Sequence, residues 1–326
     1  MIDMKNIALL TSGGDAPGMN AAIRSVVRTA IFKGLKVKGI LRGYEGLIKN
    51  EFIDMDSRCV SNILGRGGTV LKTARSLEFM TDKGQEKASR NLKEQAIDGL
   101  VVIGGNGSLQ GAIALEEKWD VTTVGIPGTI DNDLGGTDYT IGSHTSVDTV
   151  LSAVDKIRDT VTSMERIYVV EVMGREEPYI AIMAGLAGGA EEVLYPGMDM
   201  NVDIMAGNID KAEKSGKKSW IIIVSEGFGK AHDIAAEIKD ITGRSVRGIT
   251  LGHIQRGGAP NAPDRVLASR LGAYAIEEML KGVRGKMAGI SSNSLRMVPY
   301  KTACFERQKD KELNNSLYSL TKLLAT

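Results

Sequence analysis

The sequence repeats one pattern: a short apolar run, a turn rich in glycine or charge, then a stretch of helical periodicity. The apolar runs cover residues 7–10, 36–41, 100–103, 122–126, 167–172, 220–225, 246–251 and 287–290. Between several runs the apolar positions recur at helical spacing, as at Val147, Val150 and Val154 within residues 145–161. Strands that alternate with helices predict parallel sheets in α/β layers. Eight runs in 326 residues favour two doubly wound sheets over a single barrel.

Six polar turns follow the apolar runs directly. They read TSGGDAPGMN, GGNGS, GIPGTIDND, VMGREEP, SEGFG and GHIQRGG. In open α/β sheets, ligands bind just beyond the carboxyl ends of the strands. A single glycine-rich turn is weak evidence, but six of them predict that these segments build a binding site together.

Composition excludes several classes of protein. The 41 lysines and arginines nearly balance the 40 aspartates and glutamates, which argues against nucleic acid or an anionic membrane as partner. Two cysteines are too few for a disulfide framework and fit a reducing cytosol. The longest apolar stretch, near residues 179–190, is shorter than the ~20 residues that span a bilayer. We therefore expect a soluble, cytoplasmic protein.

The chain from Phe305 onwards is charged, yet it carries leucines at helical spacing. These leucines are Leu313, Leu317, Leu320 and Leu324. The spacing predicts a C-terminal helix that docks on the rest of the protein.

Two of the turns contain groups that suit phosphate chemistry. Gly13 and Gly14 precede a helix that begins near Pro17, so free amides at a helix N-terminus could bind an anion there. A tight strand-to-helix connection explains that stretch equally well. Asp131 and Asp133 provide the two carboxylates that a kinase acting on an alcohol needs, one for the hydroxyl proton and others for a metal. Taken alone, this stretch is more often an ordinary turn.

Arginines flank two further turns. Arg166 and Arg175 bracket the run at residues 167–172, and Arg247 and Arg256 bracket the turn that contains His253. Isolated arginines are normally solvated, and a lone histidine is more often structural. At such turns, however, guanidinium groups are suited to bidentate binding of phosphate.

Taken together, the motifs SGGDAPGMNAAIR, GTIDND, GTDYTIG, VEVMGR and LGHIQRGG closely resemble those of the bacterial ATP-dependent 6-phosphofructokinases, in the same order and over about residues 5–300. The resemblance implies two doubly wound, Rossmann-like α/β domains with mostly parallel sheets. A nucleotide-binding domain would comprise residues 1–141 plus 256–304, and a fructose 6-phosphate-binding domain residues 142–255 plus 305–326. It further implies a glycolytic homotetramer that uses Mg²⁺ and transfers the γ-phosphoryl of ATP to the 1-hydroxyl of fructose 6-phosphate.

The resemblance also assigns roles to individual residues. The catalytic set would be Asp131 as general base with Thr129, Arg175, Gly13 and Arg75. ATP would contact Gly13, Tyr44, Arg75, Ser76, Gly105, Asn106, Gly107, Ser108 and Gly111. Fructose 6-phosphate would contact Thr129, Asp131, Arg166, Met173, Gly174, Arg175, Glu226, Arg247, His253 and Arg256, with Arg166 and Arg247 reaching across from a neighbouring subunit.

The chain departs from the family pattern at one metal position. The family reads GGDGS where this chain reads GGNGS, so Asn106 replaces an aspartate of the magnesium site. Hard cations prefer carboxylate oxygen, but Mg²⁺ also takes waters and phosphate oxygens. With Asp133 retained, we expect a metal site at Asn106 and Asp133 that is weakened rather than lost.

Three alternatives remain open. A pyrophosphate-dependent enzyme would carry an aspartate and a lysine at the positions of Gly107 and Gly128, where this chain has room for a nucleotide. A non-catalytic regulatory relative is favoured by Asn106 alone and disfavoured by Asp131, Thr129 and Arg75. A lipid or NAD kinase would leave the turns VMGR and GHIQRGG unexplained.

The resemblance also implies an effector site for ADP or phosphoenolpyruvate between subunits. The matching residues are Arg24, Arg28, Arg58, Arg158, Gly189, Glu191 and Lys217. Ser215 and Ser219 stand where the family commonly has cationic or imidazole groups. The loss of positive charge predicts weakened inhibition by phosphoenolpyruvate.

Overall fold

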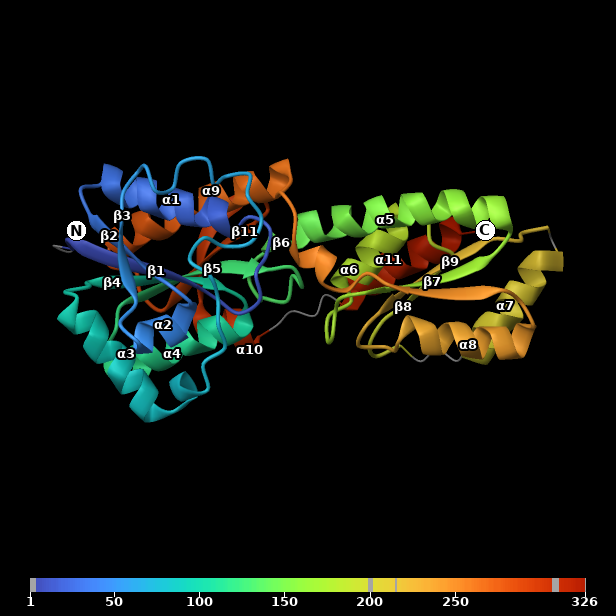
Figure 1. Ribbon diagram of the computed structural model, residues 1–326, viewed down its shortest axis with the longest axis horizontal. Coiled ribbons are helices and arrows are strands. Elements are labelled where there is room, and N and C mark those ends of the chain that lie inside the picture. The colour runs from blue at the N-terminus through green and yellow to red at the C-terminus, as the bar shows by residue number, and fades with distance from the viewer. Residues whose placement is uncertain (1–3, 199–201, 215, 307–310, 326) are drawn as a thin grey trace. The chain divides into compact units, whose positions relative to one another are not determined.

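A computed structural model describes residues 4–198, 202–214, 216–306 and 311–325. Its contacts divide the chain into two compact units (Figure 1). The first unit comprises Met1–Thr145 and Arg256–Gln308, and the second comprises Ser146–Gln255 and Lys309–Thr326. In each unit, helices cover both faces of one sheet.

The sheet of the first unit is mostly parallel. Its strands follow the order β12-β11-β5-β4-β1-β2-β3, and the short β6 pairs with β5. The strands are β1 (Asn6–Ser12), β2 (Lys36–Ile40), β3 (Phe52–Met55), β4 (Gly99–Gly104), β5 (Thr123–Thr129), β6 (Ile141–Gly142), β11 (Lys286–Ser291) and β12 (Ser294–Pro299). Only the pairings of β3 with β2 and of β12 with β11 are antiparallel, and both lie at sheet edges.

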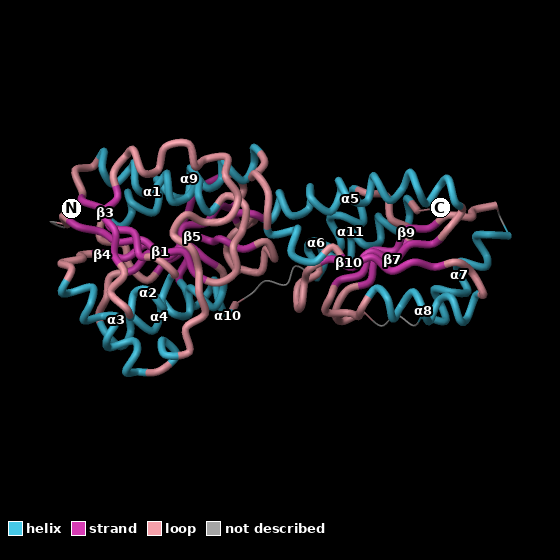
Figure 2. The backbone as a smooth tube through the Cα atoms, in the orientation of Figure 1, coloured by secondary structure: helices cyan, strands magenta, loops and turns pink. Residues whose placement is uncertain are grey.

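Two layers of helices cover this sheet. Helices α1 (Met19–Phe32) and α9 (Ala262–Leu280) pack together on one face, whereas α2 (Gly43–Ile48), α3 (Asp82–Glu94) and α4 (Asn106–Trp119) lie on the other (Figures 1 and 2). The 3-10 helix η1 (Glu78–Met80) contacts α2 and α3, and α10 (Tyr300–Phe305) contacts α4. These helices bury both faces of the central strands, as the continuous apolar runs predict.

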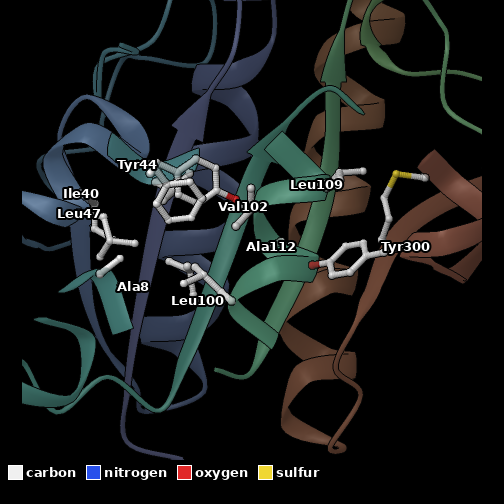
Figure 3. Packing of buried hydrophobic residues seen from close by; sticks show 14 of the residues in the cluster. Ala8, Ile40, Tyr44, Leu47, Leu100, Val102, Leu109, Ala112 and Tyr300 are labelled. Carbon is white, nitrogen blue, oxygen red and sulfur yellow. The ribbon is translucent and has the colours of Figure 1, made fainter. Parts of the chain in front are cut away.

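The core beneath α2, α3 and α4 follows the alternation of side chains along the strands. Ala8 of β1 and Leu100 and Val102 of β4 face this layer, two residues apart along β4 (Figure 3). Leu109 on α4 and Tyr300 on α10 pack into the same cluster. The Tyr300 hydroxyl lies 3.1 Å from the Thr123 hydroxyl, so the polar end of this buried ring has a partner. This packing fixes α4 against the strand whose end it follows.

The second unit has an all-parallel sheet of order β10-β7-β9-β8. The strands are β7 (Ile167–Val172), β8 (Glu192–Leu194), β9 (Trp220–Ser225) and β10 (Val246–Thr250). Helices α7 (Val202–Lys214) and α8 (Ala231–Thr242) cover one face, and α5 (Ser143–Met164), α6 (Tyr179–Ala187) and α11 (Lys311–Leu324) lie on the other (Figures 1 and 2). Helix α5 carries the chain from the first unit into the second.

The fold class expected from the sequence is confirmed. Each of the eight apolar runs forms a strand, and residues 145–161 lie within α5. The predicted C-terminal helix is present as α11 and contacts α6 and β8, although three of its four spaced leucines are exposed. Leu313, Leu320 and Leu324 are 50%, 40% and 67% exposed, whereas Thr321 is buried. Tyr318 and Lys322 hold the helix to the buried carboxylate of Glu192 instead. Among the described residues, no helix combines the length and apolarity needed to cross a membrane.

Glu171 ties β7 to its surroundings in the second unit. Its buried carboxylate accepts hydrogen bonds from the Ala231 amide at the start of α8 (3.0 Å), the Lys230 ammonium (3.2 Å) and the Thr250 hydroxyl (3.2 Å). Burial by itself raises the pKa of Glu171, but these donors outweigh it and lower the pKa below its ordinary value near 4.5.

Replacing Glu171 with Gln should therefore destabilise the protein by about 1–3 kcal/mol at neutral pH, because the charged acceptor of three bonds is lost. A depressed native pKa contributes stability above the unfolded-state pKa, and that stability disappears as the pH falls through the native value. Urea unfolding of E171Q and the parent should differ most above about pH 6, and the difference should shrink as the pH falls through the lowered native pKa of Glu171. A difference that does not depend on pH would contradict this account of the carboxylate.

Candidate active site

In the first unit, a crevice is expected where the strand order reverses, between β1 and β4. From β1 the chain continues to β2 on one side, whereas β4 lies on the other side and leads to β5. The connections after β1 and β4 thus leave on opposite sides of the sheet, and ligands of open α/β sheets bind at such a switch point. The turns at residues 12–14 and 104–108 lie there.

These two turns approach so closely that a side chain does not fit between them. A Cβ added to Gly104 would lie 2.5 Å from both the Ser108 Oγ and the Ser12 carbonyl oxygen. Gly13 has a φ of 85°, which disfavours other residues, and its added Cβ would lie 3.2 Å from the same Ser108 Oγ. Helix α4 starts at Asn106, so its free amides lie at this crevice.

The turn with the two carboxylates lies beside the same crevice. Thr129 is the last residue of β5, which pairs with β4, and a Cβ added to Gly105 would lie 3.3 Å from the Thr129 Cβ. The Asp131 amide donates to the Thr129 hydroxyl over 3.2 Å. Asp131 and Asp133 are both half-buried. The structure thus brings Thr129 and the glycine-rich turn together.

Arg256 belongs to this crevice as well. Its Nη1 donates to the Asp15 carbonyl oxygen over 3.3 Å, and a Cβ added to Gly14 would lie 2.4 Å from that nitrogen. A guanidinium therefore lies against the first glycine turn. Arg75 is exposed, and the neighbouring Ser76 hydroxyl accepts a hydrogen bond from the Phe79 amide.

Tyr44 lies in the core under α4. Its ring stacks on Phe79 with 4.0 Å between centroids, and its hydroxyl donates to the Ser108 carbonyl oxygen over 2.6 Å. Burial raises the pKa of Tyr44 well above its ordinary value. A Cβ added to Gly111 would lie 2.7 Å from the Tyr44 ring, so glycine is required where α4 crosses the ring. Tyr44 thus supports the start of α4. At Gly107, by contrast, an added Cβ would have no atom within 4 Å, so the space beside this residue is open.

Three turns of the second unit follow the adjacent strands β10, β7 and β9. The Ser225 hydroxyl and the Gly227 amide both donate to the Gly174 carbonyl oxygen. Arg175, which is 82% exposed, lies 3.5 Å from the Glu226 carboxylate. A Cβ added to Gly227 would lie only 2.0 Å from the Arg175 carbonyl oxygen, so the turns after β7 and β9 interlock through their backbones.

The third turn, after β10, is joined to the turn after β7 by Gln255, which lies within the motif GHIQRGG but was given no role from the sequence. The side chain of Gln255 is fully buried. Its Oε1 accepts from the Met173 amide over 3.1 Å, and its Nε2 donates to the Gly252 carbonyl oxygen over 2.9 Å. His253, which lies between Gly252 and Gln255 in the sequence, is exposed. Gln255 thus fixes Met173 relative to the segment that presents His253.

A second buried amide, Asn20, was also missed. Its Nδ2 donates to the carbonyl oxygens of Arg66 and Gly67, and its Oδ1 accepts from the Val70 amide. It holds the loop at residues 66–70 against α1. In a sequence, asparagine next to glycines and a helix start indicates only an ordinary turn or cap, so this role gave no signal.

Within the second unit, the structure does not bring Arg166 and Arg247 to the turns that carry Met173, Glu226 and His253. Arg166 precedes β7 and Met173 follows it, so about 23 Å of extended chain separates them. Arg247 pairs with Tyr168 near the start of β10, whereas His253 follows the end of that strand. Both arginines thus lie at the amino-terminal ends of their strands, whereas the turns follow the carboxyl ends.

Four of the residues matched to an effector site gather in the second unit. Arg158 donates to the carbonyl oxygens of Gly188 and Gly189, and the buried Glu191 lies 3.9 Å from Arg158 and 3.5 Å from Lys217. The other three, Arg24, Arg28 and Arg58, belong to the first unit. Ser219 is half-buried, and Ser215 lies outside the described residues.

Comparisons with known proteins agree with this architecture. The family model described as phosphofructokinase matches residues 6–279. The ATP-dependent 6-phosphofructokinase of Clostridium tetani (strain Massachusetts / E88) is 54% identical over 292 residues, which cover 90% of this chain and 91% of that protein. The enzyme of the same name from Clostridium botulinum (strain Hall) is 51% identical over 320 residues, covering 98% of this chain and all of that protein.

Solved structures show the same fold. Phosphofructokinase from Pichia pastoris in the T-state matches with a TM-score of 0.87 and 34% identity, covering all of this chain and 38% of that longer chain. A pyrophosphate-dependent phosphofructokinase from Marinobacter aquaeolei matches with a TM-score of 0.84 at 22% identity, covering 98% of this chain and 92% of the other, which supports the fold alone. The chain belongs to the phosphofructokinase family.

The two bonds of Gln255 generate a prediction. Gln255→Ala leaves the buried Met173 amide without its acceptor and should destabilise the protein by about 1–3 kcal/mol. Urea unfolding measures the change. Gln95→Ala is the matched control, because Gln95 makes an exposed bond to Asn50 and should cost less than about 0.5 kcal/mol. Equal stability of both variants would contradict the role given to Gln255.

Proposed function

We propose that the protein transfers the γ-phosphoryl of ATP to the 1-hydroxyl of fructose 6-phosphate, giving fructose 1,6-bisphosphate and ADP in glycolysis. The first unit would bind the nucleotide through the turns at residues 12–14 and 104–108. The second unit would bind the sugar phosphate through the turns that follow β7, β9 and β10. Relatives that are 51–54% identical and named ATP-dependent 6-phosphofructokinase support this activity.

One observation carries the choice of ATP over pyrophosphate. A Cβ added to Gly107, which follows Asn106 at the start of α4, would have no atom within 4 Å, so this glycine leaves the space in front of the helix start open. Gly128 is enclosed, because its added Cβ would lie 3.1 Å from Met19 and 3.3 Å from Ile103. Neither position carries the side chain expected of a pyrophosphate-dependent enzyme.

In this proposal, Asp131 accepts the proton of the sugar 1-hydroxyl as that oxygen attacks the γ-phosphorus. Phosphoryl transfer needs little covalent chemistry from the protein, so positioning and charge stabilisation dominate. The Gly13 amide, Arg75 and Arg175 would stabilise the transferring phosphoryl, and Thr129 would orient the hydroxyl. Met173, Gly174, Glu226, His253 and Arg256 would hold the sugar phosphate.

Asn106 and Asp133 would hold a magnesium ion, and the donors present fit that ion. The described residues contain no group of three or more His, Cys, Asp or Glu side chains arranged to bind a metal. Mg²⁺ typically needs only one or two carboxylates besides waters and substrate phosphates. When bound, Mg²⁺ neutralises charge on the phosphates. The Oδ1 of Asn106 already accepts from Gln110 over 2.9 Å, so Asp133 would contribute the charge.

A homotetramer is part of the proposal. Arg166 and Arg247 lie at the amino-terminal ends of their strands, away from the sugar turns, and a neighbouring copy would use them for the 6-phosphate. Arg158, Gly189, Glu191 and Lys217 would form part of an effector site, completed by Arg24, Arg28 and Arg58. A cytoplasmic location fits a glycolytic enzyme.

Purified protein assayed for fructose 1,6-bisphosphate should form product with ATP and none with pyrophosphate across a magnesium series.

Asp131→Asn should lower kcat by about 10²- to 10⁴-fold, because only the base is lost, with little change in the KM for fructose 6-phosphate. Asp120→Asn, on the exposed end of α4, should keep the parent kcat. No product at saturating divalent salt would overturn the function, and an unchanged kcat would remove Asp131 from the base role.

Asn106→Asp should lower the magnesium concentration that gives half-maximal activity. An added negative charge near a cation contributes about 1–2 kcal/mol, which corresponds to about a 5- to 30-fold lower requirement. Magnesium titrations of N106D and the parent under the same ATP concentration measure this. Superimposable titration curves would show that residue 106 does not face the ion.

A further inference from the structure

Asn132 stands between the two carboxylates of the acidic turn and has no role in the proposed reaction so far. Its backbone is left-handed, with a φ of 49°, a conformation that asparagine adopts more readily than most residues. Both ends of its side chain are used. Oδ1 accepts from the Thr140 amide over 2.8 Å, and Nδ2 donates to the Asp138 carbonyl oxygen over 3.1 Å. One amide therefore clamps the acidic turn to the segment at residues 138–140.

That segment is itself firmly anchored. The Asp138 amide donates to the Ile290 carbonyl oxygen and its Oδ2 accepts from the Ser292 amide, both over 2.7 Å, so the segment is attached to the end of β11. Thr140 is fully buried, and its hydroxyl donates to the Thr129 carbonyl oxygen over 2.7 Å. The clamp thus connects the acidic turn to two strands of the sheet rather than to another loop.

The anchoring continues to α9. Directly after Thr140, β6 pairs with the end of β5, and the Gly142 amide donates to the buried carboxylate of Asp264 over 2.9 Å. Asp264 also accepts from the Thr145 amide over 2.8 Å. Asn132 therefore bonds to this frame through both the donor and the acceptor of its side chain.

We propose that Asn132 is a positioning residue that sets the direction of Asp131 and Asp133, a role that rests on the proposed function. Its left-handed backbone sets the path of the chain between the two acids, and its two side-chain bonds hold that path in place. Without the clamp, Asp131 still carries its charge but samples orientations in which it does not face the sugar hydroxyl. Because misplacement of about 1 Å costs on the order of 100-fold in rate, the effect falls on kcat.

Three substitutions separate the clamp from the backbone conformation. Asn132→Gly keeps the left-handed backbone without strain and loses both bonds. Asn132→Ala loses the bonds and strains the backbone as well. Asn132→Asp keeps an acceptor for the Thr140 amide, places an acceptor instead of a donor against the Asp138 carbonyl oxygen, and adds a negative charge between Asp131 and Asp133. Asn62→Ala is the matched control, since Asn62 has a φ of 59° and is exposed on a turn away from the acids.

We expect Asn132→Gly and Asn132→Ala to lower kcat by about 10- to 100-fold, with the KM values for ATP and fructose 6-phosphate changed less than about threefold. Asn132→Asp should also stay below the parent rate, because it keeps only half of the clamp, and Asn62→Ala should match the parent. Wild-type kcat in Asn132→Gly, with only Asn132→Ala impaired, would overturn the clamp and leave only backbone strain. A rise in both KM values with kcat unchanged would overturn it equally.

Hydrogen exchange of the Thr140 amide tests the clamp independently of activity. It should be protected in the parent and exchange at least about 10-fold faster in Asn132→Gly, while core amides of β4 keep their parent rates. If the parent forms no fructose 1,6-bisphosphate, the proposed function fails but this experiment still decides whether the clamp exists. Equal Thr140 exchange in parent and variant overturns the clamp whatever the activity.

Discussion

The close approach of the turns after β1 and β4 is the constraint on which the nucleotide half of the site depends. With a Cβ at Gly104 only 2.5 Å from both Ser108 Oγ and Ser12 O, no side chain fits between the turns. Because glycine allows this approach, α4 starts directly against the end of β1, and its free amides lie next to the turn at residues 12–14. The pairing of β5 with β4 then brings Thr129 to the same place. Any larger residue at Gly104 would move all three turns apart together.

The sequence predicted the central, buried strands but not the edge strands β3 and β12 or the short strands β6 and β8, because only the buried strands have a continuous apolar run. Strands β4, β5 and β9 are buried along their whole length, so their apolar runs have no polar interruption. Edge strand β3 exposes its two middle residues, β12 alternates between exposed and half-buried positions, and β6 and β8 have two and three residues. For such segments hydrophobic periodicity is too short or too weak to distinguish a strand from a loop. The leucine spacing in α11 correctly predicted a helix, but apolar spacing alone does not show which face docks.

Candidate site residues were predictable where chemistry distinguishes them. Carboxylates, arginines and glycines that follow apolar runs drew attention to the turns of Asp131, Arg175 and Gly13, but the resemblance to a family assigned their roles, and those roles stay predictions. The sequence showed no role for Gln255 or Asn20. Their amides act by bonding to backbone groups that are distant in sequence or on another element, and nothing in a one-dimensional pattern shows where those groups lie. Polar residues that support a site are therefore found by their burial and their bonds, rather than by their type.

The acidic turn and the start of α4 divide the electrostatic work of the proposed reaction unevenly. Asn106 contributes a dipole rather than a charge, and its oxygen is already shared with Gln110. The negative charge that faces a cation must then come from the turn at residues 131–133, and a turn that carries this charge alone benefits more from being held in place. Two carboxylates so near in sequence repel one another, and a free loop would relieve that repulsion by turning one away. The bonds from Asn132 to Asp138 and Thr140 oppose such a rearrangement, so in the proposed reaction they would keep both carboxylates facing the cation to which Asn106 offers no charge.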